Sequence, residues 1–273
     1  MASATVNGID IYYELHGQGE PVLLIMGLGA NATAWVMQIP ELSGEYRVIA
    51  FDNRGSGRSG KPDGAYSIAQ MADDAALLLD ELSIHSAHVF GMSMGGMIAQ
   101  ELALRHPERV RTLILGGTMP GGPMSVMAGP RTIQQWIAAA ALPLSQAIEA
   151  GLPYLYSDEF LETNRERLVQ RALENAHLLP PAHALQKQVM AVIAFNAYGR
   201  LQEIRVPTLV LTGTHDKIVP AANSRLLAER ISGAKLIEFP GAGHGFLVER
   251  AGESNAAVLN FLAQHRLQPI SPR

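Results

Sequence analysis

The stretch Gly91-Met92-Ser93-Met94-Gly95-Gly96 matches the pattern G-x-S-x-G, and it stands where the apolar run Ala87–Met92 ends. The run predicts a buried strand, and Gly95–His106 predicts a helix that ends before the breaker Pro107. A chain that turns sharply from strand to helix is strained, and glycine is needed wherever a Cβ would collide with the neighbouring strand or helix. The turn therefore predicts an exposed hydroxyl at Ser93.

A serine hydroxyl is a poor nucleophile at neutral pH, so it needs a base to remove its proton and a carboxylate to orient that base. Asp216 stands in the loop after one apolar strand, and His244 stands in the glycine-rich loop Gly241–Phe246 after the next. The order Ser, Asp, His and the position of each residue after a separate strand place all three at one edge of a sheet, where α/β folds build their sites.

The glycine-rich segment Met26–Ala30 follows an earlier strand and offers the backbone N–H of Leu28. Together with the N–H of Met94, it would form an oxyanion hole. The predicted mechanism is attack of Ser93 on an ester carbonyl, with His244 as general base and then general acid and with Asp216 orienting the imidazole. Water then cleaves the acyl-enzyme.

Short apolar strands alternate with helices, which predicts a mostly parallel sheet covered on both faces. The alternation stops after Thr118, and residues 120–205 predict a helical cap inserted into a core of residues 1–119 and 206–273. The expected strands are Ile9–Glu14, Val22–Met26, Val48–Asp52, His88–Met92, Thr112–Gly116, Thr208–Thr212 and Lys235–Phe239, and the expected core helices are Ile68–Leu82, Gly95–His106, Asn223–Ile231 and Ala251–Gln264.

These segments, together with Phe51–Ser59, resemble the α/β-hydrolase superfamily over nearly the whole chain. The resemblance implies an eight-stranded α/β-hydrolase sheet with a helical cap, no cofactor, and a small or medium ester or lactone as substrate. Within the superfamily the chain is most similar to serine esterases and lactonases of the 3-oxoadipate enol-lactonase and methylesterase type, and cofactor-free perhydrolases or haloperoxidases are similar too. Many members have His-Gly where this chain has Met26-Gly27, and Ser93 replaces the aspartate nucleophile of haloalkane dehalogenases and epoxide hydrolases.

Composition excludes several classes of function. The formal net charge is −4 without basic runs, so nucleic-acid binding is not expected. There is no cysteine, which removes disulfides and thiolate metal sites, and the nine histidines match no metal-ligand spacing. No apolar run is long enough to cross a membrane, and no basic and apolar leader opens the chain, so a cytoplasmic protein is expected. The oligomeric state stays open.

Two other classes of function compete with an enzyme. Gly27–Ala32 reads as G-x-G-x-x-A after a strand, and Asp52 ends the next strand, as in a dinucleotide-binding protein. Against it, Pro40 shortens the following helix, and Ser93, Asp216 and His244 would have no explanation. Asp52 is instead expected to brace its loop. The second alternative is a non-catalytic α/β-hydrolase that only binds its ligand, which would share all these residues.

Overall fold

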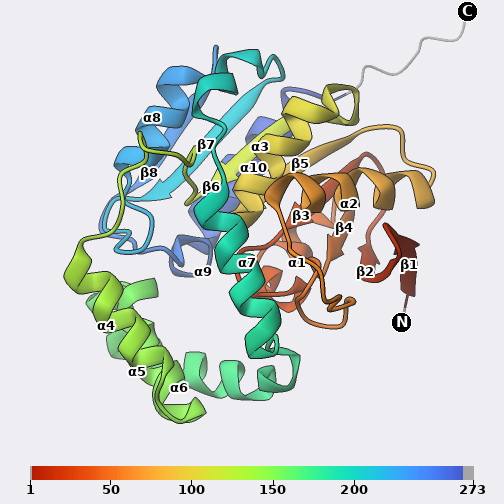
Figure 1. Ribbon diagram of the computed structural model, residues 1–273. Coiled ribbons are helices and arrows are strands. Elements are labelled where there is room, and N and C mark those ends of the chain that lie inside the picture. Colours follow the sequence, from red (N-terminus) through yellow and green to blue (C-terminus); the bar gives the residue numbers. More distant parts are fainter. Residues whose placement is uncertain (1, 267–273) are drawn as a thin grey trace, which may run out of the picture.

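The computed structural model describes residues 2–266, which contain one eight-stranded sheet in the order β1-β2-β4-β3-β5-β6-β7-β8 (Figure 1). The β1–β2 and β2–β4 pairs are antiparallel, and the remaining pairs are parallel. The predicted sheet is thus confirmed. The strands are β1 Ala2–Val6, β2 Ile9–His16, β3 Pro21–Ile25, β4 Arg47–Phe51, β5 Ala87–Met92, β6 Val110–Gly116, β7 Thr208–Gly213 and β8 Lys235–Phe239.

The predicted strands and core helices all form, with boundaries within two residues of those expected. Strand β1 was not predicted from the sequence. It is an edge strand in which only Val6 is buried, so its composition carries little of the apolar signal of a core strand. The helices are α1 Ile39–Leu42, α2 Ile68–Glu81, α3 Met94–Arg105, α4 Pro130–Ala140, α5 Leu144–Leu155, α6 Asp158–Glu174, α7 Ala182–Ala194, α8 Ala222–Arg230, α9 Phe246–Glu249 and α10 Ala251–Ala263.

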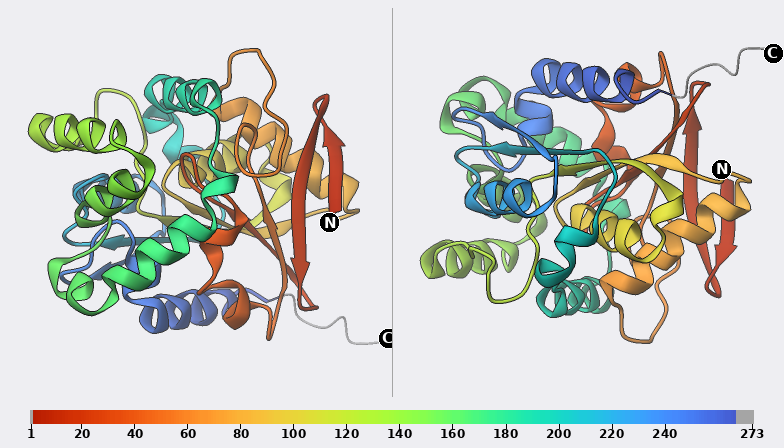
Figure 2. Two further views of the ribbon diagram at one scale, coloured as in Figure 1. Left: turned by 90° about the horizontal axis from the view of Figure 1, so that it is seen from below. Right: turned by 90° about the horizontal axis from the view of Figure 1, so that it is seen from above.

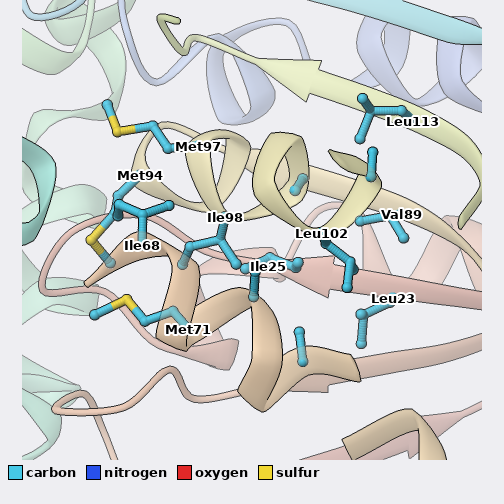
Figure 3. Packing of buried hydrophobic residues seen from close by; sticks show 14 of the residues in the cluster. Leu23, Ile25, Ile68, Met71, Val89, Met94, Met97, Ile98, Leu102 and Leu113 are labelled. Atoms are coloured by element: carbon cyan, nitrogen blue, oxygen red, sulfur yellow. The ribbon is translucent and has the colours of Figure 1, made fainter. Parts of the chain in front are cut away.

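Successive side chains of a strand point to opposite faces of the sheet, and each central strand is buried because helices cover both faces. In β3, Leu23 and Ile25 pack on one face, and Val22 and Leu24 pack on the other. Helices α2 and α3 cover the first face, and α10 covers the second (Figure 2). Figure 3 shows the first face, where side chains of β3, β5 and β6 interdigitate with Met71 of α2 and with Ile98 and other residues of α3. Burial of each such side chain contributes roughly 1.5–3 kcal/mol.

Between β6 and β7 the chain passes through α4, α5, α6 and α7. Figure 1 shows α4, α5 and α6 set apart from the sheet, with α7 nearer to it. Leu152, Leu161 and Leu168 of α5 and α6 form a small cluster of their own, whereas Ala184 and Ala191 of α7 belong to the main core. The division into a core of residues 1–119 and 206–273 and a cap of residues 120–205 stays a prediction, and residues 1 and 267–273 of that core lie outside the described residues.

None of the helices between residues 2 and 266 has the length and apolar character needed to span a bilayer.

His88 is a buried titratable group at the start of β5. Its Nδ1 lies 2.9 Å from Thr112 Oγ1, and its Nε2 lies 3.1 Å from Glu20 Oε2. Burial lowers the pKa of His88 below the ordinary histidine value, and the Glu20 carboxylate opposes this shift only in part. The unfolded chain therefore takes up a proton at His88 more readily than the folded protein does. This difference destabilises the fold as the pH drops below the unfolded pKa of about 6.5.

We predict that His88→Gln, which stays neutral, reduces the loss of stability on acidification. The free energy of unfolding of the wild type should fall more steeply than that of His88→Gln between about pH 7.5 and about pH 5.5. In the wild type the unfolded chain binds a proton at residue 88 that the folded protein does not bind, and glutamine binds none. Urea unfolding at both pH values measures the difference. Equal slopes for the two proteins would contradict the prediction.

Candidate active site

Ser93 occupies a strained backbone conformation between β5 and α3. Its φ of 57° and ψ of −121° lie in a region that residues other than glycine rarely adopt, at a cost of about 1–3 kcal/mol. Hydrogen bonds hold the turn: Ser93 N donates to Gly116 O at 2.8 Å, and Ser93 O accepts from Thr118 Oγ1 at 2.7 Å and from Gly96 N at 2.9 Å. The predicted sharp turn is therefore present, and it is tied to the end of β6.

The glycines around Ser93 are required by close backbone contacts, as predicted. A Cβ on Gly95 would lie 1.9 Å from Ile25 O, and one on Gly91 would lie 2.2 Å from Gly95 O. A Cβ on Gly27 would lie 2.9 Å from the Cβ of Ser93. Helix α3 therefore begins directly against β3, and the loop after β3 lies beside Ser93.

Asp216 and His244 are brought together from the loops after β7 and β8. His244 Nδ1 lies 2.7 Å from Asp216 Oδ2, and both side chains are largely buried. Asp216 Oδ1 accepts from the backbone N–H groups of Ile218 at 2.9 Å and Val219 at 2.8 Å. These bonds fix the carboxylate, so Asp216 orients the imidazole with Nδ1 turned toward it.

The imidazole also lies close to the turn that carries Ser93. A Cβ on Gly117 would lie 3.4 Å from His244 Cε1, and Gly117 directly follows the strand end to which Ser93 N is bonded. Among the described residues, the Ser93 hydroxyl makes no hydrogen bond to His244. In enzymes without substrate such contacts are often long and tighten in the substrate complex. Serine, imidazole and carboxylate thus converge on one edge of the sheet.

The loop that carries His244 is held by residues that no sequence motif marks. Glu249 Oε2 accepts from Gly243 N at 3.1 Å, and its other oxygen accepts a hydrogen bond from the Ser157 hydroxyl. Gly245 N donates to Leu155 O at 2.7 Å. The end of α5 and Ser157, which directly precedes α6, therefore brace the histidine loop. Ser157 and Glu249 are about 90 residues apart in sequence, so no local pattern indicates this contact.

Tyr156 lies between α5 and α6, against the histidine loop. A Cβ on Gly245 would lie 2.4 Å from the Tyr156 ring, so the ring packs directly on the glycine. Burial raises the pKa of Tyr156 to about 12, so the phenol stays neutral at physiological pH.

The loop after β3, which contains Leu28, is fixed by the loop after β4. Asn53 Nδ2 donates to Met26 O at 2.7 Å, and Asp52 Oδ1 accepts from Ala32 N at 2.8 Å. Asp52 Oδ2 accepts from Arg58 N at 2.8 Å. Because Asp52 is fully buried and occupied by these donors, it is not available to bind a ribose, which argues against a dinucleotide site. It braces its loop, as expected.

No group of three or more His, Asp and Glu side chains between residues 2 and 266 is arranged to hold a metal ion. His88 pairs with Glu20, and His106 pairs with Asp73.

The comparisons with known proteins show the family of the chain. Residues 20–251 match the model of the alpha/beta hydrolase fold family, so the chain belongs to that family. A relative from Azorhizobium caulinodans that bears the name carbamate hydrolase RutD is 34% identical over 257 residues, which are 93% of this chain and 96% of the relative. A Caulobacter relative of the same name is 34% identical over 274 residues, with 96% and 98% covered.

The chain is also similar to several solved structures. The enol-lactonase from Burkholderia xenovorans superposes with a TM-score of 0.84 at 30% identity, covering 96% of this chain and all of that one. Est816, described as an N-acyl homoserine lactone degrading enzyme, has a TM-score of 0.80 at 31% identity, with 95% and 100% covered. A protein from Mycobacterium tuberculosis that bears the name non-heme bromoperoxidase BpoC has a TM-score of 0.84 at 26% identity, with 97% and 98% covered.

We predict that Gly95→Ala strongly destabilises the protein, whereas Gly151→Ala does not. Both glycines lie in helices, but a new Cβ at residue 95 would lie 1.9 Å from the backbone of β3, whereas a new Cβ at residue 151 would meet no atom within 4 Å apart from its own helix. Overpacking of this kind costs about 1–3 kcal/mol or more, and Gly to Ala in an open helix gains up to about 1 kcal/mol. Denaturant unfolding of the two variants measures the contrast. Similar stabilities would contradict the close approach of α3 to β3.

Proposed function

We propose that the chain is a serine hydrolase that cleaves a carboxylic ester or lactone through an acyl-enzyme on Ser93. The observation that carries the proposal is the serine on its strained turn beside an imidazole that is hydrogen-bonded to a buried carboxylate. A nucleophile, a base and a group that orients the base define this reaction class by geometry. The names of the relatives, which include a lactonase and several hydrolases, support it.

In the proposed mechanism, the Asp216 carboxylate holds the Nδ1 proton of His244, which leaves Nε2 free to accept the Ser93 proton. The Ser93 oxygen attacks the carbonyl carbon, and the carbonyl oxygen becomes an oxyanion. His244 then donates its proton to the departing alcohol, or to the ring oxygen of a lactone. Water, deprotonated by His244, attacks the acyl-enzyme and releases the acid together with free Ser93.

The oxyanion would be stabilised by the backbone N–H groups of Leu28 and Met94. Met94 is the first residue of α3, where N–H groups have no partner within the helix and the helix dipole favours negative charge. Leu28 lies in the loop that contacts Ser93 through Gly27. Two N–H groups at this position act on charge that develops only in the transition state, which makes them effective in catalysis.

A second candidate is hydrolysis of a carbamate, because relatives 31–34% identical to the chain bear that name. The same three side chains would attack the carbamoyl carbon and release an amine or ammonia. Peracid formation on the same residues is favoured by the bromoperoxidase structure. A non-catalytic binding protein would bind such compounds without turnover.

The first test compares wild type and Ser93→Ala on p-nitrophenyl esters of increasing acyl length, on lactones and on aryl carbamates. The wild type should turn over an ester or lactone, and Ser93→Ala should reduce the rate by about 10⁶, because the nucleophile is gone. Circular dichroism checks that the variant is folded. Activity retained by Ser93→Ala would reject the role of this serine, and turnover of carbamates alone would favour the second candidate.

Asp216→Asn should lower kcat by about 10⁴, because an amide does not hold the imidazole tautomer that keeps Nε2 free. Asp63→Asn is the matched control, since Asp63 is fully exposed in a loop and should leave kcat unchanged. Steady-state kinetics on the best ester measures both variants. A near-normal rate for Asp216→Asn would mean that another carboxylate orients His244.

A further inference from the structure

Gln188 in the middle of α7 is fully buried, and both ends of its amide are hydrogen-bonded. Its Oε1 accepts from Gly29 N at 3.0 Å, and its Nε2 donates to Arg54 O at 2.8 Å and to Ser56 Oγ at 2.9 Å. These partners are 132 to 159 residues away in sequence. One glutamine therefore joins α7 to the loop after β3 and to the loop after β4.

The loop after β3 forms a tight turn whose shape depends on the peptide that Gln188 contacts. Ala30 N donates to Gly27 O at 3.2 Å, which makes Leu28 and Gly29 the two central residues. Gly29 has a φ of 68°, and Leu28 has no positive φ, which defines a type II turn. Type I and type II turns differ by a flip of the central peptide, which carries the Gly29 N–H. Gln188 Oε1 therefore holds this peptide in the type II orientation.

The orientation of the neighbouring peptide follows from the same turn. In a planar trans peptide the C=O and N–H point in opposite directions. Because Gly27 O is directed into the turn toward Ala30 N, the Leu28 N–H points out of the turn. Gly27 is the residue that contacts Ser93, so the direction of the Leu28 N–H beside Ser93 is set by the geometry of this turn.

We propose that Gln188 is a positioning residue: its bond to the Gly29 N–H fixes the turn in place beside Ser93, and the turn carries the Leu28 N–H that faces the oxyanion. This inference rests on the proposed function. Leu185, one helical turn earlier, supports the same turn, since a Cβ on Gly29 would lie 3.2 Å from Leu185 Cδ1. The other end of the amide is anchored on a rigid loop. Arg54 makes two hydrogen bonds of 2.8 Å to the buried carboxylate of Asp74, so the carbonyl that receives Gln188 Nε2 is itself fixed.

The experiment compares Gln188→Met, Gln188→Glu and Ser56→Ala on an ester that the wild type hydrolyses. Methionine matches the length of glutamine but accepts no bond from Gly29 N, so kcat should fall roughly 10- to 100-fold, somewhat less than the ~10²–10³ for removal of an oxyanion donor. KM should change less than about threefold, because the turn acts on charge that develops in the transition state. Gln188→Glu keeps an acceptor and should restore part of kcat. Ser56→Ala removes only an anchor of Nε2 and should stay near wild type.

A second measurement separates positioning from a general loss of structure. The affinity for an alkyl boronic acid, which forms a tetrahedral adduct on serine, should fall in Gln188→Met by a factor similar to that in kcat/KM. Thermal unfolding of each variant serves as the control for folding. If Gln188→Met does not fold, Gln188→Asn replaces it, because its shorter amide stays polar but does not reach Gly29 N.

An unchanged kcat in Gln188→Met, or equal losses in Gln188→Met and Ser56→Ala, would overturn the role of Gln188. A loss confined to KM would overturn it as well. Failure of the proposed function looks different: the wild type itself would then show no turnover that depends on Ser93.

Discussion

The close approach of α3 to β3 is the constraint on which the rest of the site depends. Helix α3 begins directly against the carboxyl end of β3 because Gly95 leaves no side chain in the way. This contact forces the strained turn at Ser93 and sets the loop after β3 beside it. The parallel strands β7 and β8 end at the same edge, so their loops bring Asp216 and His244 to the same place.

The sequence was sufficient for the core because its signals are local. Buried parallel strands appear as apolar runs, and breakers such as Pro107 mark where helices end. The pairing of Asp216 with His244 was also predictable, because strands that run parallel end at one edge whatever the details of packing. The order of the residues and their positions after strands carried that information.

What the sequence did not reveal depends on contacts between distant residues. Helices α4 to α7 were expected only as one helical segment, since their amphipathic faces pack on partners that no local pattern identifies. Glu249 and Gln188 are ordinary polar residues in helices, and their importance follows only from the backbone N–H groups that they meet. Strand β1 was missed because most side chains of an exposed edge strand are not buried, so its sequence need not be apolar.

The contacts that the insertion makes through Ser157 and Gln188 have a consequence for how such proteins diverge. Glu249 binds Ser157 and the histidine loop, and Gln188 binds the turn at Gly29, so the insertion between β6 and β7 touches two loops of the site at separate points. An insertion that fixes backbone groups in two loops beside the Ser93 turn is not an independent module. In the proposed hydrolase, exchange of this segment with that of a relative would alter the reaction rate unless both sets of bonds were transferred with it.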